Sequence, residues 1–455
     1  MIPDARAGEG ASQRYVAAIA AAGAVLLAIA LTLVAIAKPD AVPVTPSPLY
    51  LAVLAGGVAF FALVVRHTAI ALPIVVAIIY LNLSEVLVRF HGFPSILQLL
   101  ALPLFFAAWL GGGAVGAAEI LRKSMVRWLL LLVAMTAIAS TWARDVELAD
   151  ARLEETAKSL VLFFLLALLA TSLRRLELAV YALVASAAFL SVLPILQVAG
   201  AGFDNEFGGF ARTKQAQIYG TVFDERIAGP LGDPNFFAQI LLIALPLAVF
   251  VGRATPSRRL RWFGASSSVM ILIAIVLTYS RGAMLSVIVM GVFSVAAIRV
   301  DWRRIAIAAL VALAALTIMP RGVTERFITI EQIVPGTEEA LHPDSSFEER
   351  RLLVAAAWAM FADRPLTGVG PGNYAAWYEE YAETIGSISR EYGSLDDLQY
   401  PHNLYLEWGA ETGIVGLGLF LAAVATFFVY TRRSRRALAN AGMAHHSGLA
   451  AALEI

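Results

Sequence analysis

Twelve predominantly apolar runs are spread along this chain of 455 residues. A helix needs about 20 largely apolar residues to cross the hydrocarbon layer of a membrane, and a buried soluble core cannot explain twelve such runs. Only 15% of the residues are charged, against roughly 25% in soluble globular domains. We therefore predict an all-α polytopic membrane protein of about 12 transmembrane helices. The predicted spans are Tyr15–Ala37, Tyr50–Val65, Thr68–Leu83, Ile96–Leu110, Trp128–Ser140, Ser159–Leu173, Leu176–Val198, Phe236–Val251, Trp262–Thr278, Ala283–Ile298, Ile305–Met319 and Gly413–Tyr430.

The distribution of arginine and lysine predicts the orientation, because these residues collect in short cytoplasmic loops. A cytoplasmic N-terminus places most arginines and lysines of the short loops inside, which favours an even number of spans and two cytoplasmic termini. Residues 1–319 then hold spans 1 to 11, with an outward loop near residues 199–235. A large outward loop follows at residues 320–412, then the last span at 413–430 and a cytoplasmic tail at 431–455. We expect the tail to be mobile, because it is polar.

The large outward loop is predicted to be partly helical. Ser345–Phe361 has a suitable N-cap and an apolar side of Leu352, Leu353, Ala356 and Met360. Pro365 ends this helix, and the glycines of residues 368–372 form a tight connection. Gly372–Ile385 then predicts a second helix with an aromatic side.

Several cationic side chains are predicted at the outer membrane edge. Arg281 lies in a short hairpin between two spans, and Arg226 precedes the turn that begins the eighth span. A guanidinium can bind a diphosphate in two places and keeps its charge at neutral pH. The group therefore either holds an anionic lipid headgroup or anchors the span ends to phospholipid. Its other members are Arg212, Lys214, Arg350 and Arg351.

His402 is the histidine with the most informative surroundings. Pro401 before it is suited to the first position of a helix, and Asn403, Glu407 and Glu411 follow at a spacing of four, on one helical side. A neutral imidazole can take a proton from a sugar hydroxyl, and a carboxylate can orient it. The alternative is a histidine that only forms hydrogen bonds at the start of a helix.

The composition also disfavours several functions. The chain has no cysteine, which excludes disulfides, thiolate zinc sites and cysteine nucleophiles. Equal numbers of acidic and basic residues give no net field that would attract nucleic acid. We interpret Asp396 and Asp397 as solvated and predict no metal and no cofactor. No charged residue lies in the middle of a predicted span, which weakens the hypothesis of an ion-coupled transporter.

Taken in order, these motifs resemble the O-antigen ligase and polymerase superfamily. The resemblance covers about half the chain and rests on short segments of the sequence, on Arg350 fifteen residues before Pro365, and on the long loop before the last span. One departure is Val354, which stands where the family usually has an aromatic residue and leaves the assignment between Arg350 and Arg351 open. The segments are Gly232-Asp233-Pro234-Asn235, Tyr279-Ser280-Arg281-Gly282, Pro365-Leu366-Thr367-Gly368-Val369-Gly370, Pro401-His402-Asn403-Leu404-Tyr405-Leu406-Glu407 and Glu411-Thr412-Gly413.

The resemblance implies a C-type glycosyltransferase-like fold in the bacterial inner membrane, with the active site facing the periplasm. It implies an O-antigen ligase that transfers O-polysaccharide from undecaprenyl diphosphate to lipid A–core, inverting and metal-independent. His402 would be the base, and Arg226, Arg281 and Arg350 would bind the diphosphate, with Arg212 and Lys214 as auxiliaries. Asp233 and Asn235 would fix the turn and the start of the helix, and Glu407 and Glu411 would orient the site.

Two alternatives to the ligase stay open. An O-antigen polymerase would use the same donor with a second lipid-linked glycan as acceptor, and the large loop before the last span favours the ligase. A lipid-linked glycan exporter is the alternative from a different class, and it would require no transfer chemistry.

Overall fold

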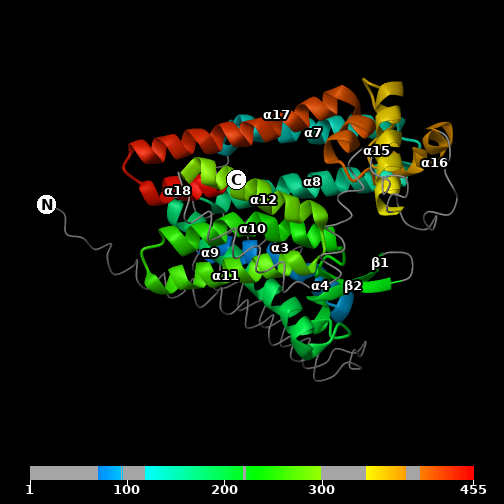
Figure 1. Cartoon of the computed structure of the whole chain (residues 1–455). Helices are drawn as coiled ribbons and strands as arrows, with labels where there is room; N and C mark the ends of the chain where they lie inside the picture. The colour runs from blue at the N-terminus through cyan, green and yellow to red at the C-terminus, as the bar shows by residue number, and fades with distance from the viewer. Residues whose placement is uncertain are drawn as a thin grey trace. The chain divides into compact units, whose positions relative to one another are not determined.

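The structure is a computed structural model that describes residues 70–93, 95, 118–218, 222–298, 345–385 and 400–454. These residues are mostly helical (Figure 1). The chain divides into two compact units, which are described one at a time. The first unit comprises Met1–Gly113, Leu169–Ile328 and Thr431–Ile455, and the second comprises Ala114–Leu168 and Thr329–Tyr430.

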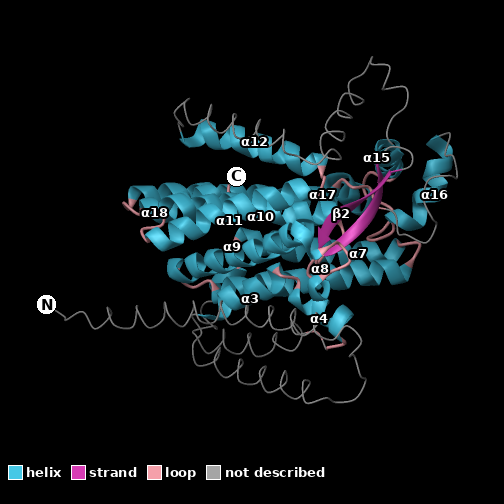
Figure 2. Ribbon diagram, turned by 60° about the horizontal axis from the view of Figure 1, so that its bottom comes forward, coloured by secondary structure: helices cyan, strands magenta, loops and turns pink. Residues whose placement is uncertain are grey.

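The described part of the first unit is a helical bundle with one β-hairpin (Figure 2). Helices α9, α10 and α11 pack side by side, and α3 packs on α9. The backbones of α10 and α11 approach closely where Gly252 meets Gly264. Glycine permits this approach, because a Cβ on Gly264 would overlap the Gly252 backbone. The elements are α3 (Ala71–Tyr80), α4 (Leu83–His91), α9 (Leu173–Leu196), η3 (Gln197–Ala201), η4 (Phe207–Gly209), β1 (Arg212–Ile218), β2 (Val222–Gly229), α10 (Pro234–Ala254), α11 (Arg258–Leu277), α12 (Arg281–Ile298) and α18 (Ala444–Ala452).

The described part of the second unit is built from helices joined by tight turns. Its buried residues include Leu353, Met360, Tyr374 and Ala410, which come from three different helices and form one core cluster. The elements are α7 (Ser124–Ala139), η2 (Ser140–Trp142), α8 (Val146–Leu169), α15 (Ser345–Asp363), α16 (Tyr374–Ile385) and α17 (Leu404–Asn440). The last residues of α8 and of α17 belong to the first unit.

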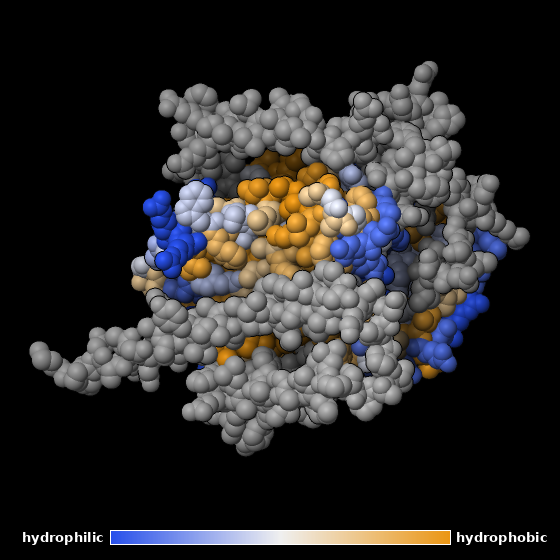
Figure 3. Space-filling view, turned by 90° about the horizontal axis from the view of Figure 1, so that it is seen from below, coloured by the Kyte–Doolittle hydropathy of each residue, from blue (hydrophilic) through white to orange (hydrophobic). Residues whose placement is uncertain are grey.

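Five helices among the described residues are long and apolar enough to cross a membrane. A sixth candidate is the pair α3 and α4, which bends by 52°. Exposed apolar side chains such as Trp262, Val269 and Ile273 on α11 fit contact with lipid, and Figure 3 shows a hydrophobic patch with hydrophilic residues at its ends. These features are those of an integral membrane protein. The five spans are Ser124–Trp142, Leu173–Ala201, Pro234–Ala254, Arg258–Leu277 and Leu404–Asn440.

The predicted total of 12 spans is only partly covered by the described residues. The runs Tyr15–Ala37, Tyr50–Val65, Ile96–Leu110 and Ile305–Met319 lie outside them. The third predicted span is a broken helix, because Asn82 adopts a left-handed φ of 51° between α3 and α4.

Two further predicted spans correspond to helices outside this set of five. The sixth is the second half of α8, whose first half carries many charged residues. The tenth corresponds to α12 (Arg281–Ile298), an apolar helix.

Three local structures were not predicted from the sequence. The segment near residues 199–235 contains the antiparallel hairpin β1–β2 within a structure whose described residues are otherwise mostly helical. Helix α8 begins at Val146, well before Ser159, the start of the predicted sixth span. The tail is not a mobile polar segment, because α18 buries Leu449 and Ala450.

Candidate active site

His402 lies directly before the helix that carries the last predicted span. Helix α17 begins at Leu404, and the Asn403 side chain caps it by accepting hydrogen bonds from the backbone N–H groups of Tyr405 (3.1 Å) and Leu406 (3.2 Å). The prediction that Pro401 takes the first helical position was therefore wrong, because the asparagine cap begins the helix three residues later. His402 is exposed and has a left-handed φ of 50°, a conformation that residues other than glycine rarely adopt.

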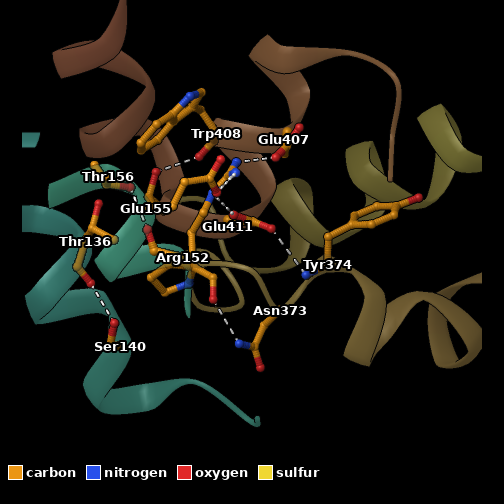
Figure 4. A network of polar contacts seen from close by, with 12 residues as sticks. Thr136, Ser140, Arg152, Glu155, Thr156, Asn373, Tyr374, Glu407, Trp408 and Glu411 are labelled. Atoms are coloured by element: carbon orange, nitrogen blue, oxygen red, sulfur yellow. Dashed lines mark hydrogen bonds and ion pairs between the residues drawn. The ribbon is translucent and has the colours of Figure 1, made fainter. Parts of the chain in front are cut away.

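Glu407 and Glu411 lie one turn apart on the same side of α17, and both face Arg152 of α8 (Figure 4). The Arg152 guanidinium pairs with Glu407 through Nη2 and lies 3.9 Å from Glu411 through Nε. It also contacts Glu155 at 3.3 Å and lies over the ring of Trp408. The arginine side chain is 22% exposed, against 14% for Glu407 and 7% for Glu411.

Arg152 remains cationic in this setting. Burial alone would lower the pKa of Arg152, but the carboxylates of Glu411, Glu407 and Glu155 outweigh burial and raise the pKa above its ordinary value. Arg152 was not predicted as a site residue, because Glu407 and Glu411 lie far from it in the sequence. The sequence signal that could have identified Arg152 is Glu155, which follows three residues later, a spacing that places both residues on one side of a helix.

The glycine turn after α15 is docked onto α17 by backbone hydrogen bonds. The N–H groups of Val369 and Gly370 donate to the carbonyls of Ala410 (2.8 Å) and Glu411 (3.0 Å), and that of Ile414 donates to Pro365 (2.7 Å). The two motifs Pro365–Gly370 and Glu411–Gly413 are therefore one structural unit. The predicted helix Ser345–Phe361, its end at Asp363 and the turn that follows are confirmed.

Glycine is required on both sides of this contact. Gly413 has a φ of 67° and interrupts α17, and a Cβ on it would overlap the Leu366 backbone. Gly368 has the same φ, and a Cβ there would overlap the Glu411 backbone. The predicted second helix is also confirmed, as α16, with Tyr374 buried at its start.

Arg350 and Arg351 lie early in α15 and are both exposed. The buried side of the same helix packs, through Leu353, into the cluster that contains Ala410 of α17. Helix α15 therefore contacts the helix that follows His402. The choice between Arg350 and Arg351 stays open, because both residues are exposed.

The first unit brings other predicted residues together. Arg226 at the end of the hairpin donates from Nε to the carbonyl of Thr278 (3.1 Å) and from Nη2 to Asn235 Oδ1 (3.4 Å). Asn235 also accepts a hydrogen bond from Ser280 (3.0 Å), and Arg281 follows directly as the first residue of α12. Arg226 is therefore joined to the turn that holds Arg281.

The hairpin places two like charges opposite each other. Lys214 on β1 pairs directly with Arg226 on β2, and Lys214 is exposed. Like charges at directly opposite positions destabilise a β-sheet pair. An anion bound between Lys214 and Arg226 would remove this repulsion. We call Lys214, Arg226 and Arg281 the cationic corner.

Arg212, Asp233 and Asn235 have local structural partners. The Arg212 guanidinium lies over the Phe90 ring and against Gly232. The Asp233 side chain caps α10 by accepting from the N–H groups of Asn235 (2.8 Å) and Phe236 (3.0 Å). This confirms that Asp233 fixes the start of the helix.

The predicted site residues thus form two groups, one in each unit. His402, Asn403, Glu407, Glu411, Arg350 and Arg351 belong to the second unit, and the cationic corner belongs to the first. The meeting of His402 with the cationic corner stays a prediction. Asp396 and Asp397 lie outside the described residues, so metal independence also stays a prediction.

A cavity of about 490 Å³ lies in the second unit between α7, α8 and α17. Its lining is mainly apolar and includes Leu160, Phe163 and Phe427. Arg152 and Trp408 border the same cavity. Such a lining favours an apolar occupant, for example a hydrocarbon chain.

Residues 266–421, about a third of the chain, match the family model for O-Antigen ligase. This match supports membership of the O-antigen ligase/polymerase superfamily. Members of this superfamily are glycosyltransferase-like enzymes of glycan biosynthesis that use lipid-linked polysaccharides. The matched segment includes Arg281, Arg350 and His402, whereas Arg226 lies before it. A search of curated proteins found no match.

Proposed function

We propose that the protein is an O-antigen ligase of the bacterial inner membrane. It transfers O-polysaccharide from undecaprenyl diphosphate to lipid A–core at the periplasmic face, without a metal ion and with inversion. The observation that carries this proposal is the position of His402, an exposed imidazole directly before a capped helix in the superfamily's matched segment.

The proposed reaction is a single displacement. The His402 imidazole removes the proton from the acceptor hydroxyl as its oxygen attacks the anomeric carbon. The bond between this carbon and the diphosphate oxygen breaks, and the new glycosidic bond forms on the opposite face of the sugar. The leaving diphosphate gains negative charge, which nearby guanidinium and ammonium groups stabilise.

The charge distribution of the first unit supports the donor half of this proposal. The cationic corner holds three positive side chains, on β1, β2 and α12, and its opposed Lys214 and Arg226 favour an anionic ligand. Arg350 is proposed as the further diphosphate binder, with Arg351 as the alternative and Arg212 as an auxiliary. The apolar cavity of the second unit suits the lipid part of a lipid-linked substrate.

Transfer by the purified protein tests the proposal. The full chain in detergent receives a lipid-diphosphate glycan and lipid A–core, with and without a chelator. Product that forms equally in both reactions supports a metal-independent ligase. Product only with a second lipid-linked glycan as acceptor would indicate the polymerase instead, and the absence of product with either acceptor would favour an exporter.

Cells without the protein provide a second test. A ligase predicts that all O-chain is lost from the lipid A–core. A polymerase predicts that a single repeat remains attached. An exporter predicts that the donor fails to reach the outer leaflet.

A further inference from the structure

Arg152 closes a ring of contacts around the start of α17. It binds Glu407 and Glu411 on that helix, and Glu411 accepts a hydrogen bond from the backbone N–H of Tyr374 (3.5 Å). Asn373, the residue before Tyr374, is fully buried and binds the backbone of Asp145, directly before α8. Helix α8 carries Arg152, so the ring returns to its starting point (Figure 4).

We propose that Arg152 is a positioning residue for glycosyl transfer, which fixes the first two turns of α17 and thereby the direction in which His402 is presented. The inference rests on the proposed function, since it concerns the geometry of the proposed base. It assigns Arg152 no contact with the substrate.

The path from Arg152 to His402 is short and hydrogen-bonded. The N–H of Glu407 donates to the carbonyl of Asn403 (2.9 Å), which is the first helical bond of α17. Asn403 also caps the helix with its side chain and directly follows His402. A rotation of the first turn of α17 would therefore move the His402 imidazole, because only the capping residue Asn403 lies between this turn and His402.

The charges around Arg152 explain why the arginine is needed. Glu407 and Glu411 lie four residues apart on one side of α17, and both are largely buried. Like charges at this spacing repel each other on a helix. Removal of one partner from a buried charge group leaves the other charges uncompensated. Without Arg152, the two carboxylates would separate, and the first turns of α17 would shift.

The same charges argue against a diphosphate-binding role for Arg152. Its guanidinium is already paired with the carboxyl groups of Glu407, Glu411 and Glu155, which compensate its positive charge. A diphosphate would have to displace these partners and leave buried acidic groups uncompensated. The donor affinity should therefore survive a change at Arg152, whereas the rate of transfer should not.

Steady-state kinetics of two variants of the full-length protein test the inference. For Arg152→Gln we expect a fall in kcat of about 10- to 100-fold, because small displacements of a reacting group have effects of this size. The KM for the donor should stay within about twofold of the wild-type value. Arg152→Lys keeps the charge but loses the planar fork, so its kcat should lie between those of wild type and Arg152→Gln.

Arg144→Gln provides the matched control. Arg144 lies just before α8 and also pairs with a glutamate, Glu380, but both partners are about half exposed. It has no described contact with α17. This variant should therefore keep the wild-type kcat.

A double variant tests whether Arg152 acts through Glu407. Arg152→Gln with Glu407→Gln removes one of the two repelling carboxylates, so its kcat should exceed that of Arg152→Gln alone. Equal or lower activity of the double variant would contradict the mechanism. An Arg152→Gln variant with a raised KM and an unchanged kcat would overturn the inference, because that result indicates direct substrate binding.

Hydrogen exchange provides a readout that does not depend on transfer. Amides of residues 404–411 should exchange faster in Arg152→Gln than in wild type, and should be unchanged in Arg144→Gln. Unchanged exchange in Arg152→Gln would overturn the inference even if the wild type is active. If the wild type makes no product although exchange responds as expected, the proposed function fails, and the role in transfer fails with it.

Discussion

The side-chain amide of Asn373 binds both backbone groups of Asp145, a residue 228 positions away in the sequence. Its Oδ1 accepts from the Asp145 N–H (2.7 Å), and its Nδ2 donates to the Asp145 carbonyl (2.9 Å) and to that of Pro371 (2.9 Å). This contact joins the glycine turn to the start of α8. It explains how a segment of the large loop and a helix from the middle of the chain share one buried polar core.

Replacement of Asn373 by alanine should destabilise the protein. The change removes three buried or partly buried hydrogen bonds and leaves the Asp145 backbone without its Asn373 partner, so we expect a loss of about 2–4 kcal/mol. Thermal unfolding of the purified protein in detergent measures the effect. Asn440→Ala, at an exposed position near the end of α17, should change stability by less than about 0.5 kcal/mol. Equal unfolding temperatures for the two variants would contradict the role of Asn373.

Gly413→Ala should disrupt the contact between α17 and the glycine turn. The new Cβ would overlap the Leu366 backbone, and alanine would be strained at a φ of 67°. We expect a loss of stability of more than about 1 kcal/mol. Gly418→Ala is the matched control, because it lies on the same helix and a Cβ there meets nothing within 4 Å. The prediction fails if both variants unfold at the wild-type temperature.

Lys214→Glu should have opposite effects on stability and on donor binding. The change replaces a like-charge pair with Arg226 by an attractive pair, which should stabilise the hairpin by about 0.2–1 kcal/mol. It also removes a positive charge from the cationic corner, so the lipid-diphosphate donor should bind more weakly. Unfolding experiments and donor-binding titrations measure the two effects separately. Unchanged donor affinity would argue against a diphosphate at this corner.

Local sequence signals predicted much of the helical structure. The cap, apolar side and stop signals of α15 and the cap of α10 at Asp233 act over a few residues, so they can be recognised without the fold. The hairpin β1–β2 was missed because its register depends on pairing between segments. Arg152 was missed because its partners Glu407 and Glu411 lie more than 250 positions away.

The first residue of α17 could not be predicted for a different reason. Pro401 and Asn403 are both suited to the start of a helix, and the sequence does not say which one the chain uses. In the structure the asparagine side chain binds two backbone N–H groups, a contact that proline cannot make. His402 therefore lies outside the helix, exposed, instead of within its first turn.

Transfer by the His402→Ala variant tests the central claim most directly. The control is His342→Ala, which removes another histidine of the predicted outward loop at residues 320–412. The purified variant, the wild type and this control receive the same lipid-diphosphate glycan and lipid A–core, and product formation and donor binding are measured in parallel. If His402 is the base, His402→Ala loses transfer by at least about 100-fold and binds the donor almost as well as wild type, and His342→Ala stays active. Wild-type turnover by His402→Ala would contradict the account.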